Sequence, residues 1–254
     1  MVVSEVDDDF LVATDLHKSF DSVLAVDGVS FAVSKREIFG LLGPNGAGKT
    51  TTLRILSTVL RPDSGDVTIG GHSVLGESDR VRQLIGVCPQ DIALYAELSA
   101  IDNLVFFGKM AGLRGGEAKE RAYGILERVG LTDRAKGAVA KFSGGMKRRL
   151  NIAVALMNTP ALLMLDEPTV GIDPQSRSHI FDTILQLRDE GMTVLYTTHY
   201  MEEADRLCDR IGIIDNGRLI ALDTPRGLKS QVGDPDSTTL EEVFLNLTGR
   251  SLRD

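Results

Sequence analysis

The segment at residues 43–51, GPNGAGKTT, carries the residue types that chemistry on a phosphate group needs. Its glycines let the backbone curl so that consecutive N–H groups face one anion, and the N-terminus of a following helix points its positive end at the same place. Lys49 can neutralise phosphate charge, and the Thr50 hydroxyl can bind Mg²⁺. The segment predicts a phosphate-binding loop made of Gly43, Pro44, Asn45, Gly46, Ala47, Gly48, Lys49, Thr50 and Thr51.

Two adjacent carboxylates, Asp166 and Glu167, follow the apolar run at residues 161–165. An apolar strand presents such residues at its carboxyl end, where ligands bind in parallel sheets. Asp166 suits Mg²⁺ through a water molecule, and Glu167 suits the role of base for an attacking water. An ordinary acidic strand end is the alternative for this segment alone. Beside a phosphate-binding loop that alternative explains little, and the two motifs together predict a P-loop nucleoside triphosphatase.

A third motif, Ser143-Gly144-Gly145, opens a predicted helix about 23 residues before Asp166. A serine and two glycines at a helix N-terminus make a second anion-binding cap, and a plain N-cap is the alternative for this segment alone. Within FSGGM, the motif resembles the LSGGQ signature of the nucleotide-binding subunits of ABC transporters. The resemblance covers roughly residues 10–248.

The resemblance implies that the signature of one subunit faces ATP held by the phosphate-binding loop of a second subunit, with a homodimer as the expectation. It implies hydrolysis of Mg²⁺-bound ATP with Glu167, His199, Gln90 and Lys49 as catalytic residues. The nucleotide would also meet Phe20 by stacking on adenine, and Ser143, Gly144, Gly145 and Asp173 across the dimer. His199 would contact the γ-phosphate, and the loop of Gln90 would respond to the membrane partner. The metal ligands would be Thr50, Gln90 and Asp166.

Two departures from the common pattern narrow the resemblance. Phe20 stands where tyrosine is usual, which keeps stacking but loses a hydroxyl, and Met146 ends the signature instead of glutamine. The FSGGMKRRL form and the closing LEEVFLNLT segment resemble the branch that includes daunorubicin-resistance and sodium-export ATPases. That branch implies export through a separately encoded permease, and a location at the cytoplasmic face of the membrane. We expect Lys147, Arg148 and Arg149 to form a solvated helix face and not to contact phosphate.

The alternating apolar segments predict an α/β fold: a P-loop NTPase core of mostly parallel sheet flanked by helices, an N-terminal antiparallel β subdomain and an inserted α-helical subdomain. We expect a disordered acidic tail at residues 1–9 and a single ABC ATPase domain at 10–254. Within it, 10–98 and 159–232 form the core, 99–158 the helical signature subdomain, and 233–254 a spacer and helix. Expected details include a turn at Asp27-Gly28, a helix at 50–60, and a hairpin across residues 215–217.

Composition restricts the partners. The 254 residues carry a formal net charge of −8, which argues against a nucleic-acid-binding protein. Cys88 and Cys208 fit no metal spacing and are expected to be free thiols. No apolar run approaches the roughly 18 residues of a membrane helix, so another chain would supply the membrane part. The alternative functions are a soluble ABC-type ATPase without a transport role and a binding module with an inactive site. The intact catalytic set argues against the second.

Overall fold

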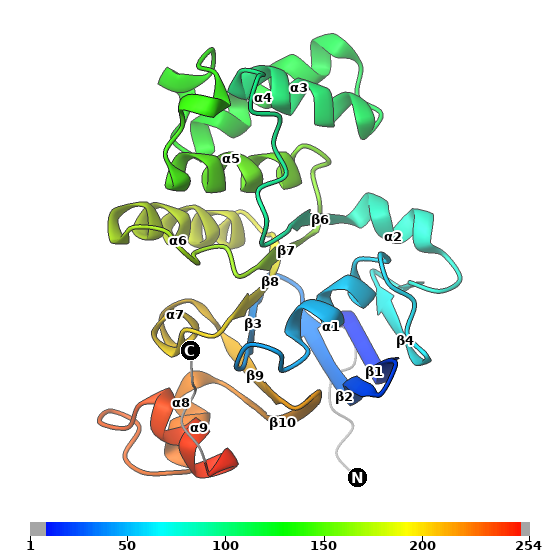
Figure 1. The fold of residues 1–254 in the computed structure, drawn as a ribbon, viewed down its shortest axis with the longest axis vertical. Coiled ribbons are helices and arrows are strands. Elements are labelled where there is room, and N and C mark those ends of the chain that lie inside the picture. Colours follow the sequence, from blue (N-terminus) through cyan, green and yellow to red (C-terminus); the bar gives the residue numbers. More distant parts are fainter. Residues whose placement is uncertain (1–8, 250–254) are drawn as a thin grey trace.

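A six-stranded sheet with the order β10-β9-β3-β8-β7-β6 forms the centre of the computed structural model, which describes residues 9–249 (Figure 1). Five strands of this sheet, β9, β3, β8, β7 and β6, run parallel to one another, and only β10 is antiparallel to its neighbour. The strands are β3 (Ile38–Leu42), β6 (Ile85–Cys88), β7 (Leu162–Asp166), β8 (Thr193–Thr198), β9 (Arg210–Asp215) and β10 (Arg218–Asp223). This is the predicted mostly parallel core, with the expected hairpin at its edge.

A second, antiparallel sheet lies beside the core and has the order β2-β1-β4-β5. Its strands are β1 (Asp9–Phe20), β2 (Val23–Ser34), β4 (Ser64–Ile69) and β5 (His72–Ser73). The expected turn at Asp27-Gly28 is wrong, because β2 runs through both residues. Gly28 has φ +69 and sits where the register shifts, so its left-handed backbone makes a bulge and no chain reversal. Asp9 belongs to β1 and not to the expected tail; residues 1–8 lie outside the described range.

Nine α-helices are assigned within residues 9–249. The helix expected at 50–60 ends four residues earlier, because Thr58 takes φ +63 and the chain turns there. The helices are α1 (Lys49–Leu56), α2 (Ser78–Leu84), α3 (Ala100–Met110), α4 (Gly115–Arg128), α5 (Gly144–Leu156), α6 (Pro174–Asp189), α7 (Met201–Leu207), α8 (Pro225–Ser230) and α9 (Leu240–Thr248). None is long and apolar enough to cross a membrane within the described range.

The core has two layers because successive strand residues point to opposite faces of the sheet. On β7, Leu162 and Met164 join one buried cluster, while Leu163 and Leu165 join the other. All four side chains are fully buried, as expected for a parallel strand covered on both faces. The burial of each such side chain stabilises the fold by about 1.5–3 kcal/mol. The apolar strand therefore holds Asp166 and Glu167 at a fixed place.

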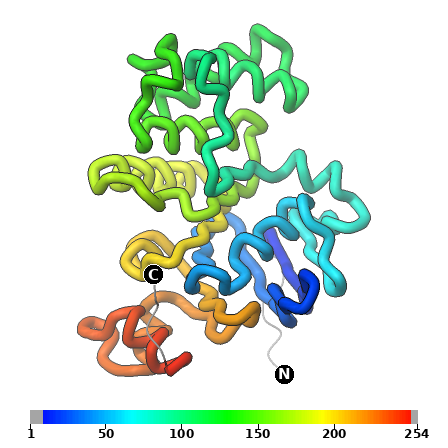
Figure 2. The backbone as a smooth tube through the Cα atoms, in the orientation of Figure 1, coloured from blue at the N-terminus to red at the C-terminus, as the bar shows by residue number. Residues whose placement is uncertain are grey.

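The helices α3, α4 and α5 lie together at one end of the molecule, away from α1 and the antiparallel sheet (Figure 1). The chain leaves the central sheet after β6, builds these helices, and returns at β7 (Figure 2). Because β6 and β7 are adjacent parallel strands, the chain leaves at the carboxyl end of β6 and returns at the opposite edge of the sheet, at the amino end of β7. The segment that leaves the sheet carries Gln90, so the sheet and the helical part are joined next to a predicted site residue. The exact subdomain limits stay a prediction.

Candidate functional site: a phosphate-binding cavity

The phosphate-binding loop joins β3 to α1 and is packed against β2 and the β9–β10 hairpin. A Cβ atom on Gly43 would lie 2.1 Å from the Ile214 carbonyl oxygen, and one on Gly48 would lie 2.4 Å from that of Ala25. Gly48 also has φ +105, a conformation that glycine alone adopts easily. The Gly217 N–H donates to the Ala47 carbonyl at 3.0 Å. The loop therefore has its shape before any ligand binds.

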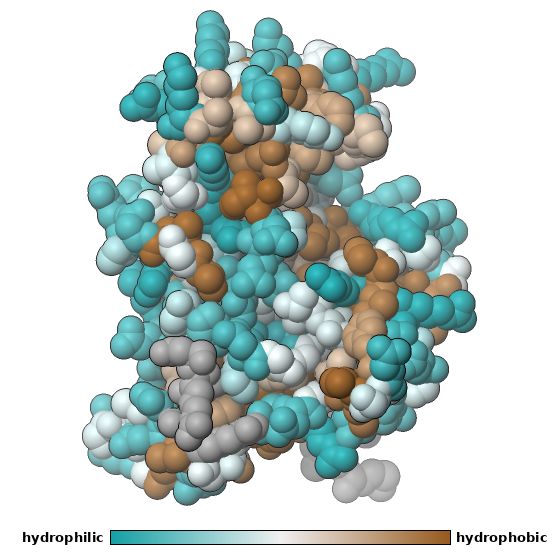
Figure 3. Space-filling model, viewed as in Figure 1, coloured by the Kyte–Doolittle hydropathy of each residue, from teal (hydrophilic) through white to brown (hydrophobic). Residues whose placement is uncertain are grey.

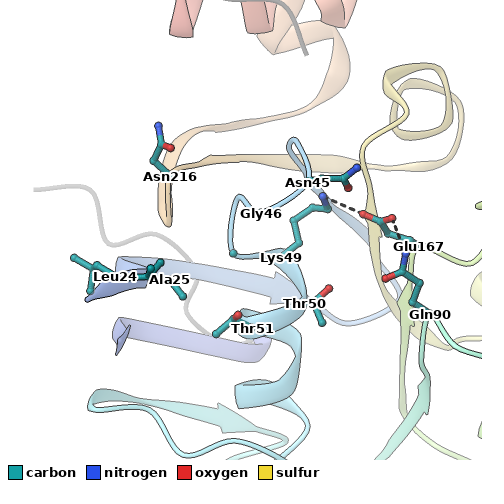
Figure 4. A pocket seen from close by; sticks show the side chains of 12 residues that line it. Leu24, Ala25, Asn45, Gly46, Lys49, Thr50, Thr51, Gln90, Glu167 and Asn216 are labelled. Carbon is teal, nitrogen blue, oxygen red and sulfur yellow. Dashed lines mark hydrogen bonds and ion pairs between the residues drawn. The ribbon is translucent and has the colours of Figure 1, made fainter. Parts of the chain in front are cut away.

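A cavity of about 360 Å³ opens in front of this loop, within the range of sites that bind small molecules (Figure 4). Eight predicted site residues line it: Asn45, Gly46, Gly48, Lys49, Thr50, Thr51, Gln90 and Glu167. Four lining residues were not predicted: Val23, Leu24, Ala25 and Asn216. They come from β2 and the β9–β10 turn, and no sequence pattern ties these segments to the loop.

Lys49 lies at the buried end of the cavity, with a relative exposure of 4%. Its Nζ donates to the carbonyl oxygens of Gly43 at 2.7 Å and Pro44 at 3.0 Å. The same nitrogen is 3.0 Å from Oε1 of Glu167, as Figure 4 shows. The positive charge of Lys49 is therefore balanced by the carboxylate predicted to act as base.

Asp166 joins three elements at the end of β7. Its Oδ1 accepts a hydrogen bond from Thr197 Oγ1 at 2.7 Å and one from Thr50 Oγ1 at 3.3 Å. The carboxylate is 4% exposed. The structure therefore brings the two oxygen-bearing residues Thr50 and Asp166 together, as the motif spacing predicts for a magnesium site.

Glu167 has a strained backbone, with φ +44, in a region that costs a non-glycine residue about 1–3 kcal/mol. Its N–H donates to the carbonyl and to Oγ1 of Thr197, at 3.2 and 3.0 Å. These bonds hold the residue so that its carboxylate faces the cavity. Gln90 Nε2 lies 3.4 Å from Glu167 Oε2. Glu167 is thus the point at which Lys49 and Gln90 meet (Figure 4).

His199 also faces Glu167, with Nδ1 3.2 Å from Oε2. The ring nitrogen is not aligned for a hydrogen bond and has no such partner among residues 9–249. The contact is therefore an ion pair when the imidazole is protonated. This arrangement leaves a polar imidazole atom available beside the predicted base.

The donor set fits Mg²⁺, which is the metal implied by the motifs. Mg²⁺ prefers oxygen ligands, keeps several waters, and uses one or two carboxylates together with substrate phosphates. The Thr50 hydroxyl and the Asp166 carboxylate meet these needs. Within the described residues, no group of three or more His, Cys, Asp or Glu side chains could hold a metal by itself.

The signature residues do not line the cavity. Ser143 caps α5, with its Oγ accepting from the Met146 N–H at 3.2 Å. Asp173 caps α6 by accepting from the Ser176 N–H at 2.9 Å, and this bond lowers the pKa of its carboxyl. A Cβ atom on Gly145 would lie 2.1 Å from Ser176 Oγ, so the N-termini of α5 and α6 are in contact. Ser143, Gly144 and Asp173 are exposed and, with the buried Gly145 beneath them, form a separate surface, which we call the signature surface.

Phe20 also lies outside the cavity lining, at the end of β1, and is 45% exposed. It pairs across the hairpin with Val23, which does line the cavity. The Lys18 ammonium lies 5.7 Å from the centre of its ring. The side chain is thus free to stack on a ligand near the cavity mouth, and its adenine contact remains a prediction.

The expectation of a solvated face at residues 147–149 is wrong for the two arginines. Arg148 is 4% exposed, and its two terminal nitrogens donate to the carbonyls of Pro89 at 2.9 Å and Gln90 at 2.6 Å. Arg149 donates to the carbonyl of Val129 at 2.8 Å. A run of basic residues is solvated unless the fold brings acceptors to it, and here the acceptors lie far away in the sequence.

Glu203 is a second buried residue that the sequence does not single out. It is 2% exposed and accepts hydrogen bonds from Thr169 Oγ1 at 2.7 Å, Tyr196 Oη at 2.8 Å and Thr198 Oγ1 at 3.0 Å. Burial raises the pKa of Tyr196 well above its ordinary value. Thr169 follows Asp166 and Glu167 closely and Thr198 precedes His199, so Glu203 ties these two segments together. Its helix face gives no sequence signal for this role.

Comparison with known proteins gives a consistent result. Residues 26–170 match the family model described as ABC transporter. The chain is 56% identical to the linearmycin resistance ATP-binding protein LnrL of Bacillus subtilis, over 88% of this chain and 72% of that protein. It is 46% identical to the daunorubicin/doxorubicin resistance ATP-binding protein DrrA of Streptomyces peucetius, over 86% of this chain and 66% of that protein.

Among solved structures, an ATP-binding subunit of an ABC transporter has a TM-score of 0.83 at 29% identity, covering 94% of this chain and 99% of that one. The predicted fold class and the predicted family branch are thereby confirmed. Both curated relatives are longer than the part that matches. The chain belongs to the ABC transporter family and carries the ATP-binding ATPase domain of that family.

Proposed function

We propose that the chain is the ATP-binding subunit of an exporter and that ATP hydrolysis by a dimer drives transport through a separately encoded permease. One observation carries this proposal: three predicted catalytic residues, Lys49, Gln90 and Glu167, line one cavity with His199 beside Glu167, while the signature surface lies outside it. A helix N-terminus with a serine cap and glycines attracts phosphate. The signature surface does not face the cavity of its own chain. A second copy placed head-to-tail would bring its cavity, with the bound ATP, against this surface.

Within each cavity, the chain's own residues position the attacking water and neutralise the charge of the phosphates. Lys49 leaves Glu167 and moves its charge to the β- and γ-phosphates, so that the carboxylate is released to accept a proton from water. Gln90, which already contacts Glu167 at 3.4 Å, orients that water. His199 holds the γ-phosphate side of the site. Phosphoryl transfer asks mainly for such positioning, with little covalent work by the protein.

Thr50 and Asp166 would hold Mg²⁺, with Gln90 as the third predicted ligand. The ion would supply positive charge to the phosphate oxygens when bound. The Thr50–Asp166 contact at 3.3 Å keeps both oxygens in place beforehand.

The permease partner is supported by an apolar surface next to Gln90. Ile92, Tyr95, Phe106 and Met110 are 41%, 47%, 38% and 74% exposed. The rings of Tyr95 and Phe106 pack edge to face at 4.9 Å. Hydrophobic side chains gather over the helical part of the molecule in Figure 3. Clustered exposed apolar side chains mark interaction sites, and this one adjoins the loop predicted to respond to the membrane partner.

Export is proposed from the relatives, whose names state resistance to linearmycin and to daunorubicin or doxorubicin. Removal of a toxic compound from the cell is the transport direction that resistance requires. The chain would then work at the cytoplasmic face of the membrane, held there by its permease.

The dimer is tested with an aspartate placed at Gly144. A Cβ atom there has Ile172 as its nearest neighbour at 3.9 Å, so Gly144→Asp fits the monomer. Glu167→Gln is expected to form an ATP-dependent dimer in size-exclusion chromatography. Adding Gly144→Asp should abolish that dimer, since a carboxylate would face phosphate, while ATP still binds the monomer. Gly124→Asp on α4, which has no neighbour within 4 Å, is the matched control and should leave the dimer intact. A dimer that survives Gly144→Asp contradicts the head-to-tail site.

The permease is tested by co-expression with a polytopic membrane protein encoded next to this chain. The chain should then be recovered with the membrane, and Tyr95→Asp should return it to the soluble fraction. Recovery in the soluble fraction in every case favours the ATPase without a transport role.

A further inference from the structure

The loop that carries Gln90 has few backbone hydrogen bonds of its own. We call residues 89–94 the Gln90 loop. No backbone-to-backbone hydrogen bond outside the helices and strands of the described range involves these residues. Residues 89–93 are exposed, so neither burial nor a ladder of backbone hydrogen bonds restrains the chain here. The conformation of the loop, and with it the position of the Gln90 side chain, must therefore be fixed by something else.

Two side chains of α5 supply those bonds. Arg148 donates to the carbonyls of Pro89 at 2.9 Å and Gln90 at 2.6 Å. Asn151, one helical turn later, reaches the Pro89 and Asp91 carbonyls with Nδ2, both at 3.3 Å, and accepts from the Ala93 N–H with Oδ1 at 3.2 Å. Arg148 and Asn151 thus hold the Gln90 loop along most of its length.

The charge on Arg148 makes this contact demanding. The side chain is 4% exposed, and within residues 9–249 it forms no salt bridge with a carboxylate. Its Nε has no hydrogen-bond partner in that range. A buried cation without a counter-ion is costly unless dipoles satisfy it, and a lost partner leaves that cost uncompensated. Breaking either hydrogen bond would leave the buried charge of Arg148 unsatisfied, so the two carbonyls are firmly restrained.

We infer that Arg148 is a positioning residue: it ties the Gln90 loop to the signature helix and so sets the contact between Gln90 and Glu167. The inference rests on the proposed function, because it gives Gln90 a role in hydrolysis. Arg148 lies in the second turn of α5, the helix that Ser143 caps. One rigid helix therefore carries the signature surface at its start and fixes the Gln90 loop from its next turn, and the two are positioned together.

The test is a double-mutant cycle in steady-state ATP hydrolysis by the full chain. Arg148→Met keeps side-chain length and removes the donors, and it should lower kcat by about tenfold with little change in KM, because charged hydrogen bonds to backbone are lost. Gln90→Ala should lower kcat similarly. If Arg148 acts through Gln90, the double variant falls no further than Gln90→Ala. Additive losses overturn the inference.

A second measurement does not depend on hydrolysis. Cys88 is fully buried directly before the Gln90 loop, with Sγ 3.4 Å from Asn151 Nδ2. In a Cys208→Ala background, Arg148→Met should raise the rate constant per thiolate of Cys88 toward a disulfide reagent at least about tenfold, because the covering loop opens. Expressing the rate per thiolate separates this effect from the higher pKa that loss of the Arg148 cation gives the thiol. An unchanged rate overturns the clamp even if kcat falls. If the wild-type chain hydrolyses no ATP, the proposed function fails while this rate still judges the clamp.

Two variants serve as controls. Arg121→Met removes another arginine that donates to a backbone carbonyl, that of Met157 at 3.1 Å. Arg121 makes no hydrogen bond to the Gln90 loop. It should leave kcat and the Cys88 rate unchanged. Arg148→Lys keeps the charge but lacks the forked donor that bridges both carbonyls. Its kcat and its Cys88 rate should lie between those of the wild type and Arg148→Met. It also keeps the inference testable if the methionine variant does not fold. Wild-type values for Arg148→Lys in both assays contradict the need for a forked donor.

Discussion

The ion pair between Lys49 and Glu167 leads to a prediction with two opposite effects in one variant. Both side chains are buried, and their charged atoms are 3.0 Å apart. With an effective dielectric constant near 20, their direct attraction is about 5 kcal/mol as an upper bound. After desolvation, a hydrogen bond to a charged group contributes about 1.5–3 kcal/mol. A nucleotide must break this contact to recruit Lys49.

Glu167→Gln removes the charge that competes with the nucleotide for Lys49. ADP affinity should therefore rise about tenfold, since about 1.4 kcal/mol corresponds to a factor of ten. Turnover of ATP should fall about 10²–10⁴-fold, the usual loss when a general base is removed. Isothermal titration with ADP and a phosphate-release assay measure the two effects. Unchanged or weaker ADP binding refutes the competition, and normal turnover refutes Glu167 as the base.

Glu37→Gln is the matched control. Glu37 is another buried carboxylate beside a cation, with Arg210 Nη1 at 3.3 Å, and it also accepts from the Ser34 N–H at 2.7 Å. It precedes β3, at the end of the strand opposite the phosphate-binding loop. Its replacement should lower the melting temperature yet leave ADP affinity and turnover within about twofold of wild type.

Three further outcomes are expected. Lys49→Ala should weaken ADP binding about 10–100-fold, measured by titration, because a charged donor to phosphate is lost. Glu203→Gln should lower the free energy of unfolding by about 1–3 kcal/mol in urea denaturation, because an acceptor for three buried hydroxyls becomes partly a donor. Burial raises the pKa of Cys88 from 9.0 to about 11, so the unfolded chain loses this proton first as pH rises. The contribution of Cys88 to the free energy of unfolding should then be constant below pH 9 and fall by about 2–3 kcal/mol towards pH 11. Urea denaturation of the wild type and Cys88→Ala measures this, and the variant should lack the loss.

Each of these outcomes has a clear opposite. Wild-type ADP affinity in Lys49→Ala would remove the lysine from phosphate binding. An unchanged urea midpoint in Glu203→Gln would mean that the buried hydroxyl network adds no stability. Equal alkaline sensitivity of the wild type and Cys88→Ala would show that the thiol does not ionise differently in the two states.

The sequence by itself determined the hydrolytic chemistry of this protein. The phosphate-binding loop, the carboxylates after a buried strand and the cap before α5 are short segments, and each motif defines its own local geometry. A five-residue apolar run such as β7, ending in two carboxylates, predicts a buried strand, so the position of Asp166 and Glu167 at its carboxyl end followed from local pattern.

Tertiary structure decided which residues from distant segments are in contact. The cavity walls from Leu24 and Asn216, the burial of Arg148 and the network around Glu203 all join segments far apart in the chain. A polar or basic residue has the same local pattern whether it faces water or a distant carbonyl, because burial depends on the partner surface and not on neighbours in sequence. Gly28 makes the same point, since a left-handed glycine serves a turn or a bulge equally well until strand pairing selects one.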